Sequence, residues 1–217
     1  MKTIASCVEE LLIKQPFLEE ALFRDIINFS ALAEELQPSV SAMLRKPVKS
    51  GAIMMALRRY NPPNHLRQSQ RLQAVLKDLG DITVRSNLVD FTYQNSATLI
   101  ERHAQVLKAI DPKAFYGFSR GIYESNIVVS ASEERLISQH FKNEVLLGSQ
   151  DQLSAISIRL PKNNSKMSGL YYQIFKRLAW EGISLYEVIS TTNEFTVLVE
   201  LHLVDKAFSA IKNLHQF

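Results

Sequence analysis

The spacing of hydrophobic residues changes near residue 61 of this 217-residue chain. Before that point apolar residues recur at steps of three and four, which predicts amphipathic helices. The expected helices cover residues 6–20, 29–36, 39–44 and 50–60. Breaks are expected at Pro16, Pro38 and Pro47, because proline removes a backbone donor and clashes with the preceding turn. The N-terminal part of the chain is therefore predicted to be helical.

After Gly80 the pattern becomes one of short strands alternating with helices. The first set comprises a strand over 82–93, a helix over 96–110, strands over 115–118 and 123–129, and a helix over 132–141. The second set comprises a strand over 153–160, a helix over 169–181, strands over 183–190 and 195–200, and a helix over 204–214. Two β-α-β-β-α units in succession predict an α+β fold of the ferredoxin-like class.

Four segments follow from these patterns. They are a helical domain over 1–63, a basic linker or helix over 64–80, one β-α-β-β-α unit over 81–150 and a second over 151–217. The first boundary is set by Asn61-Pro62-Pro63-Asn64, since paired prolines stop a helix. No apolar run reaches the length of a membrane span, and Glu9 and Glu10 stand where a signal peptide needs an apolar core. A cytoplasmic protein without membrane contact is expected.

Charge is segregated along the chain. Eight Lys or Arg residues and no Asp or Glu lie between Arg45 and Lys77, although the formal net charge of the chain is only +3. Such a block favours a polyanionic partner, while a solvated basic helix and linker is an equally simple interpretation.

The residues that would carry enzymatic chemistry are missing from the pattern. Seven glycines form no phosphate-binding loop, and five histidines show no metal-ligand spacing. The single cysteine, Cys7, fits a small buried residue in a reducing compartment. We therefore expect no catalytic residues, no cofactor and no metal.

The second β-α-β-β-α unit carries recognisable motifs. Ser168-Gly169-Leu170 opens a helix, Glu181-Gly182-Ile183-Ser184-Leu185 leads into a strand, and Ile189-Ser190-Thr191-Thr192 ends it. With these pieces, residues 153–214 resemble the ACT domains of aspartokinases, and residues 81–150 fit a divergent first copy. The resemblance implies an allosteric regulatory module that pairs side by side with another and binds a small amino acid at the interface. It does not extend to the kinase domain of that family, so no kinase activity is expected.

The loop before Gly169 is the expected ligand site. The N–H groups at the start of the following helix can receive a carboxylate, and Gly169 allows close approach to the backbone. The expected ligand-binding residues are Asn163, Asn164, Ser165, Lys166, Met167, Ser168, Gly169 and Leu170. A polar turn without a ligand is the alternative. Ser168 stands where the family often has proline, and the loop has no Asp, so the preference for one amino acid is not transferable.

The chain shows no closing strand after its last predicted helix. Either residues 82–93 supply that strand or a second subunit does, because an uncovered sheet edge invites pairing. We expect a homodimer formed through the ACT-like units.

The stretch Val48–Tyr60 resembles the last part of a winged helix-turn-helix domain, and residues 28–36 resemble its preceding helix. Eleven residues, 37–47, separate the two. The expected buried face is Ala52, Ile53, Ala56, Leu57 and Tyr60. The expected DNA-binding residues are Ser50 and Met54 at base edges, with Lys49, Arg58 and Arg59 at phosphates. A helical appendage with Met54 and Met55 as a partner surface is the alternative.

Together these features predict a non-catalytic, amino-acid-binding regulator of amino-acid metabolism that binds double-stranded DNA and regulates transcription in response to its ligand. The alternative is an aspartokinase-like regulatory subunit that docks on a separate metabolic enzyme.

Overall fold

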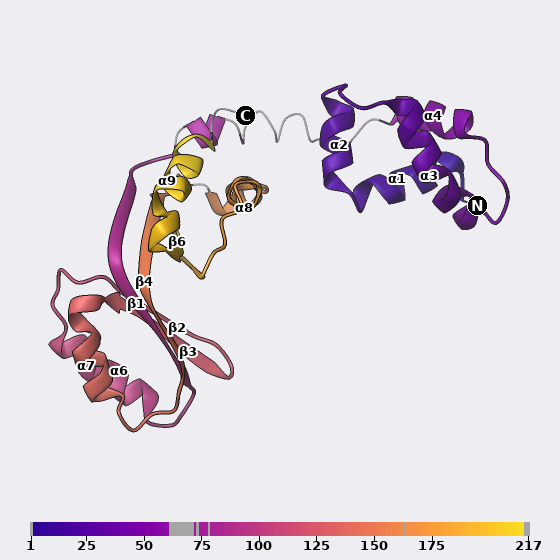
Figure 1. The fold of residues 1–217 in the computed structure, drawn as a ribbon. Coiled ribbons are helices and arrows are strands. Elements are labelled where there is room, and N and C mark those ends of the chain that lie inside the picture. The colour runs from indigo at the N-terminus through magenta and orange to yellow at the C-terminus, as the bar shows by residue number, and fades with distance from the viewer. Residues whose placement is uncertain (1, 61–71, 73, 78, 163, 215–217) are drawn as a thin grey trace. The chain divides into compact units, whose positions relative to one another are not determined.

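A computed structural model of the chain describes residues 2–60, 72, 74–77, 79–162 and 164–214. The chain divides into two compact units, Met1–Arg67 and Gln68–Phe217 (Figure 1). The expected Asn61–Asn64 turn and most of the basic segment 64–80 lie outside the described residues.

The N-terminal unit is helical throughout its described residues. Its elements are α1 (Ile4–Ile13), α2 (Pro16–Phe23), α3 (Phe29–Leu44) and α4 (Ser50–Arg59). The core between them includes Cys7, Leu12, Val40, Ile53 and Leu57, so the expectation that Cys7 is buried is confirmed. Residues 2–60 contain no strand, and a winged domain needs a β-hairpin for its wing.

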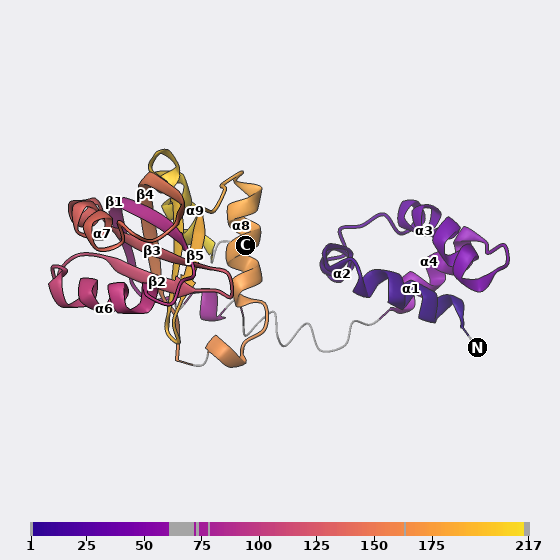
Figure 2. The same cartoon turned by 90° about the horizontal axis from the view of Figure 1, so that it is seen from below.

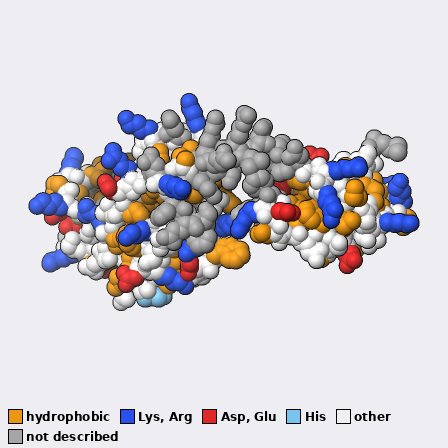
Figure 3. All heavy atoms as spheres, turned by 90° about the horizontal axis from the view of Figure 1, so that it is seen from above, with side chains coloured by type: hydrophobic (Ala, Val, Ile, Leu, Met, Phe, Trp, Pro, Cys, Tyr) orange, Lys and Arg blue, Asp and Glu red, His pale blue; other side chains and the backbone are white. Residues whose placement is uncertain are grey.

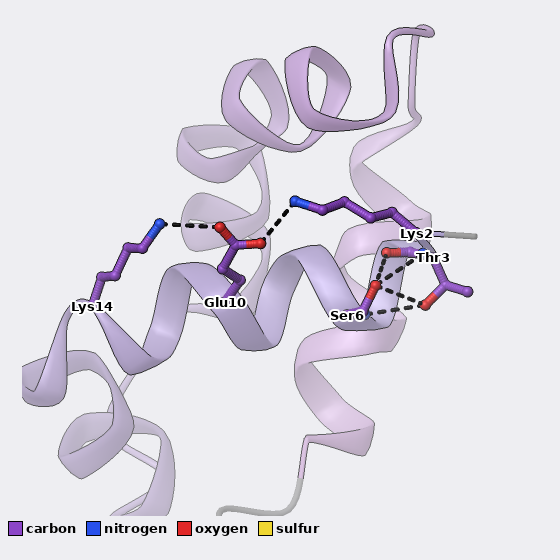
Figure 4. Close-up of polar contacts among 5 residues, drawn as sticks. All are labelled: Lys2, Thr3, Ser6, Glu10 and Lys14. Carbon is purple, nitrogen blue, oxygen red and sulfur yellow. Dashed lines mark hydrogen bonds and ion pairs between the residues drawn. The ribbon is translucent and has the colours of Figure 1, made fainter.

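The start of α1 is fixed by local polar contacts (Figure 4). Thr3 and Ser6 form a reciprocal capping box, in which each side chain accepts from the other residue's backbone N–H. One turn later, Glu10 accepts from Lys2 at 2.9 Å and from Lys14 at 3.1 Å. The side chains of this cluster are exposed, so the contacts define where the helix begins more than they stabilise the unit.

Helix α3 corrects the expected break at Pro38. It runs without interruption through Pro38 and ends only at Leu44, with Arg45 in the left-handed conformation at its C-cap. Leu36 and Val40, on either side of the proline, are both buried in the helical core. Burial of this face offsets the one backbone hydrogen bond that proline removes.

The C-terminal unit is built on one six-stranded antiparallel sheet with the order β2-β3-β1-β4-β6-β5. Its strands are β1 (Ile82–Gln94), β2 (Tyr116–Arg120), β3 (Glu124–Ser130), β4 (Leu146–Arg159), β5 (Glu187–Ser190) and β6 (Glu194–Glu200). Its α-helices include α6 (Leu99–Ala109), α7 (Glu134–His140), α8 (Leu170–Trp180) and α9 (Val204–Lys212), and residues 74–77 are helical as well. The order of helices and strands agrees with the pattern of the sequence, and the fold is α+β.

Strands β1 and β4 are the two central strands and pair with each other, so each contributes to both halves of the sheet. One end of β1 (residues 88–94) pairs with β3, whereas the other end (82–85) pairs with residues 155–158 of β4. The same part of β4 pairs on its other side with β6. Two sources of a closing strand for the second unit were expected. The strand is supplied by the same chain, because residues 82–85 of β1 pair with β4. Figure 1 shows β1 and β4 running side by side between the two helix pairs.

Helices α6, α7, α8 and α9 cover the same face of the sheet, here called the outer face. Ile156, Ile158 and Val197 lie in the core under α8 and α9. Val89, Phe91 and Ile127 lie in the core under α6 and α7. A register shift between Arg85 and Leu88, where Asn87 adopts a φ of 62°, moves the apolar positions of β1 from even to odd numbers. This β-bulge keeps both apolar stretches of β1 on the outer face.

The opposite face, here called the inner face, is closed by curvature of the sheet. Its apolar cluster joins Leu88, Val128, Leu153 and Leu198 to Phe115 and Ile189 near the two edge strands. A Cβ added to Gly117 of β2 would lie 2.8 Å from Ile189 Cδ1 of β5. Ser119 Oγ of β2 donates to Glu187 Oε1 of β5 at 3.3 Å. The two edge strands of one sheet therefore meet across the inner face (Figure 2).

Candidate ligand-binding sites

The loop between β4 and α8 has a fixed backbone. Asn164 is buried, and its Nδ2 donates to the carbonyl oxygens of Pro161 at 2.8 Å and Thr192 at 2.7 Å. Both amide hydrogens of this side chain are therefore used within the protein, to tie the loop to the β5–β6 turn. Asn164 fixes the loop and has no N–H left for a ligand.

The other expected ligand-binding residues divide into exposed and buried groups. Ser165, Lys166 and Ser168 are exposed to solvent. Met167 packs against the core under α8 and α9, and Leu170 is fully buried in it. Asn163 lies outside the described residues. Among these expected residues, the exposed polar groups that the structure describes are the hydroxyls of Ser165 and Ser168 and the ammonium group of Lys166.

Gly169 is the N-cap of α8 with a φ of 91°, a conformation that side chains other than glycine rarely adopt. A Cβ at this position would lie 3.2 Å from Leu72 Cδ2. A glycine N-cap has no side chain that can accept from the first-turn N–H groups, and no side-chain cap is present at α8. These donors, with the positive end of the helix dipole, can receive an anionic group such as a carboxylate.

Helix α4 presents only part of its expected DNA-binding surface. Lys49, Arg58 and Arg59 are exposed, and Arg58 lies over the ring of Phe29 at 5.7 Å. Met54 is partly buried, and Ser30 Oγ lies 3.6 Å from its sulfur, so its side chain packs on the start of α3. Ser50 is partly exposed and Ala52, expected on the buried face, is exposed. Figure 3 shows basic and hydrophobic side chains next to each other on this unit.

A buried polar cluster on the inner face was not anticipated from the sequence. Asp90 is fully buried and accepts from Tyr186 Oη at 3.2 Å, Thr92 Oγ1 at 3.3 Å and Asn126 Nδ2 at 3.4 Å. Glu187 accepts from Ser119, while its Oε2 is buried without a hydrogen-bond partner. These residues come from four strands and a loop, and β-strand spacing alone does not bring them together.

Burial sets the ionisation of this cluster. Desolvation raises the pKa of the Asp90 carboxyl above its usual value, against the opposing effect of its three side-chain donors. Desolvation and then the nearby Asp90 charge raise the pKa of the Glu187 carboxyl. Burial and then Asp90 raise the pKa of Tyr186 to about 12, so its hydroxyl remains a donor.

A groove of about 610 Å³ lies on the inner face, near the start of β1 and the end of β4. Charged and hydroxyl side chains line it, and of these only Thr191 belongs to a motif recognised in the sequence, Ile189–Thr192. Alternation in Asp81-Ile82-Thr83-Val84-Arg85 was a signal that the polar residues share a face. The sequence did not show that this face would be hollowed into a groove.

Within the residues that the structure describes, no group of three or more His, Cys, Asp or Glu side chains is placed to hold a metal ion. No helix in those ranges has both the length and the apolar composition required to cross a membrane.

Comparison with solved structures shows the fold. The chain is similar to the aspartate kinase of Clostridium acetobutylicum, with a TM-score of 0.54 and 13% identity over 63% of this chain and 35% of that one. It is similar to a chain from a structure of aspartokinase alpha and beta subunits, with a TM-score of 0.52 and 14% identity, covering 64% of this chain and 99% of that one. The regulatory subunit of aspartate kinase from Thermus thermophilus has a TM-score of 0.50 and 9% identity, covering 63% and 97%.

This chain thus spans about a third of the length of the clostridial aspartate kinase. No family model and no curated protein matches the sequence. At identities of 9–14%, the similarity shows a fold shared with these aspartokinase chains, one of which is a regulatory subunit.

Proposed function

We propose that the chain is a non-catalytic regulatory protein whose C-terminal unit consists of two ACT-type units and binds a small amino acid. The observation that carries the proposal is the match to aspartokinase chains, one of them a regulatory subunit, over 97–99% of their length. The sheet supports the proposal. Strands β2-β3-β1-β4 form one ferredoxin-like order and strands β1-β4-β6-β5 form the other, with β1 and β4 common to both.

The loop around Gly169 is the proposed amino-acid site. The uncapped first turn of α8 offers N–H donors to the ligand carboxylate, and Ser165 and Ser168 add exposed hydroxyls. Lys166 adds an exposed positive charge beside these donors. Rigidity of the loop, which comes from Asn164, reduces the entropy lost on binding.

A homodimer is part of the proposal. Helix α8 leaves Tyr172 and Phe175 46% and 39% exposed, next to the proposed loop. Aromatic side chains of this kind are enriched at interfaces between subunits. A dimer mass in sedimentation equilibrium is expected, and a monomer across the micromolar range would contradict it.

Thermal-shift screening of the full chain against the twenty amino acids tests the central proposal. A ligand that binds only the folded state raises the melting temperature, and the shift grows with the logarithm of ligand concentration once that exceeds the Kd. Lys166→Ala should reduce the shift, whereas Lys162→Ala, an exposed lysine earlier in the same loop, serves as the matched control. If no amino acid moves the transition, the sensor function is rejected. Incubation with ATP and aspartate should give no phosphorylated product.

A second candidate function is ligand-responsive DNA binding. Because α3 continues to Leu44, only residues 45–49 separate it from α4, which is closer to the short turn of a helix-turn-helix than the eleven residues expected. Arg58 and Arg59 are exposed in the last turn of α4. In this function, amino-acid binding changes the spacing of two N-terminal units in a dimer.

Fluorescence anisotropy with duplex DNA at several salt concentrations tests this candidate. Arg58→Ala with Arg59→Ala should weaken binding and reduce its salt dependence, because fewer phosphates are neutralised. Arg24→Ala, an exposed arginine outside α4, should have less effect. No binding at low salt would favour the alternative, a regulatory subunit that docks on a separate metabolic enzyme and changes the activity of that enzyme.

A further inference from the structure

The inner-face groove has a polar floor built from paired hydroxyls. Ser157 Oγ of β4 and Thr196 Oγ1 of β6 lie 2.7 Å apart, and Thr196 is 3% exposed. Thr83 of β1 is directly opposite Ser157 and lines the same groove. Thr83 and Ser157 line the groove and can accept from or donate to a polar ligand, while the buried Thr196 hydroxyl holds that of Ser157 in place.

One rim of the groove carries both signs of charge. Glu194 of β6 is directly opposite Arg159 of β4. Asp81 lies beside Arg159, because the Asp81 backbone carbonyl accepts the Arg159 backbone N–H at 3.0 Å. In the described part of the chain, neither carboxylate forms an ion pair with Arg159 or with another cation. An arginine between two carboxylates matches the adjacent carboxylate and ammonium of an α-amino acid.

The other rim carries a single oriented cation. Arg85 is opposite Ala155 on the inner face, and its Nη1 donates to the Lys113 carbonyl at 3.1 Å. That carbonyl belongs to a turn held by Asp111, whose Oδ1 accepts the Lys113 N–H at 2.8 Å. Arg85 and Asp81 are four residues apart, about 13 Å at the backbone. Arg85, Asp81 and Arg159 all line the groove.

We propose that this groove binds an acidic α-amino acid, of which glutamate is the probe. Arg159 takes the α-carboxylate, Asp81 and Glu194 take the ammonium group, and Arg85 takes the side-chain carboxylate. The site lies within one chain and is separate from the loop at Gly169. It rests on the proposed amino-acid-binding function and adds a ligand class and a second location to it.

Isothermal titration calorimetry on the full chain tests the proposal with glutamate, glutamine and lysine. Arg159→Gln should weaken glutamate binding at least tenfold, because the α-carboxylate loses its partner. Arg85→Gln should remove most of the preference for glutamate over glutamine. Arg120→Gln, an exposed arginine at the end of β2, is the matched control and should bind as the unmodified protein does.

Three outcomes separate this inference from the function on which it rests. If no amino acid binds the unmodified protein, the proposed function and this site both fail. If an amino acid binds and Lys166→Ala weakens it while Arg159→Gln and Arg85→Gln do not, the function stands and the groove site is rejected. Loss of glutamate binding in both arginine variants, with unchanged melting temperatures and a normal Arg120→Gln control, supports the groove.

Discussion

The outer face of the sheet is packed with aliphatic side chains, whereas the inner face mixes apolar residues with carboxylates and hydroxyls. Ile156, Ile158 and Val197 on the outer face are fully buried under helices. On the inner face, Asp90 and Thr196 are buried beside a much smaller apolar cluster. Buried polar groups cost stability unless they are satisfied, so the inner face is where stability and ligand binding compete.

The largest difference between the faces should appear when an outer-face side chain is truncated. Ile158→Ala should lower the free energy of unfolding by about 2–5 kcal/mol, because it removes transfer energy and leaves a cavity. Val84→Ala is the control on the same face, since Val84 is 40% exposed. Urea unfolding measures both. Equal losses in the two variants would mean that Ile158 is no more buried in the core than Val84 is.

Contact between the edge strands across the inner face is tested by Gly117→Val. The new side chain would overlap Ile189 Cδ1 and should cost about 1–3 kcal/mol of unfolding free energy. Gly148→Val is the matched control in β4, where an added Cβ meets no atom within 4 Å. Combining Gly117→Val with Ile189→Ala should restore part of the loss. Without that recovery, the edges do not meet as described.

The pH dependence of stability reports the buried carboxyl of the inner face. Burial raises the pKa of folded Asp90 above its unfolded value of 3.8. The stability that protonated Asp90 contributes to the folded state is therefore fully present below pH 3.8. The contribution is lost as pH rises through the folded pKa. The unfolding free energy of Asp90→Asn, relative to that of the unmodified protein, should therefore increase as the pH rises from 3.8 through the folded pKa. A constant difference across that range would show that Asp90 is not desolvated.

The smallest expected effect is at the hydroxyl pair of the groove floor. Ser157→Ala should cost about 0.5–1.5 kcal/mol, because the buried Thr196 hydroxyl loses its partner. Ser157→Ala with Thr196→Val should cost less than the sum of the single changes. Chemical denaturation of the four proteins completes the cycle. Additive losses would indicate that the two hydroxyls do not interact.

The sequence predicted the elements well where apolar spacing is regular. The helices over 99–109 and 170–180 and the strand 194–200 lie within two or three residues of their expected bounds. Residues 146–152 of β4 were missed, because Leu-Leu-Gly-Ser-Gln-Asp-Gln has no period-two alternation. That stretch is a strand because it pairs with β1, a partner more than fifty residues earlier.

The candidate sites were less predictable than the fold. The loop at Gly169 was found because a turn, a glycine and a helix start are neighbours in sequence. Asp90 and Asn126 are far apart in the chain and meet because β1 pairs with β3, whereas Glu187 of the edge strand β5 joins them because the sheet curls. The side of the sheet on which Arg85 lies also depends on the β-bulge at Asn87, which no local motif marks.

The sharing of β1 and β4 has a consequence for any attempt to cut the C-terminal unit in two. The expected boundary between residues 150 and 151 falls inside β4, and a fragment that begins at 151 lacks the β1 strand that flanks residues 155–158. Neither fragment would keep a complete set of strand partners. Unfolding of one half of the sheet removes hydrogen-bonding partners from the other half, so we expect the unit to unfold as one cooperative body. A ligand bound in one half would then be energetically linked to the other half.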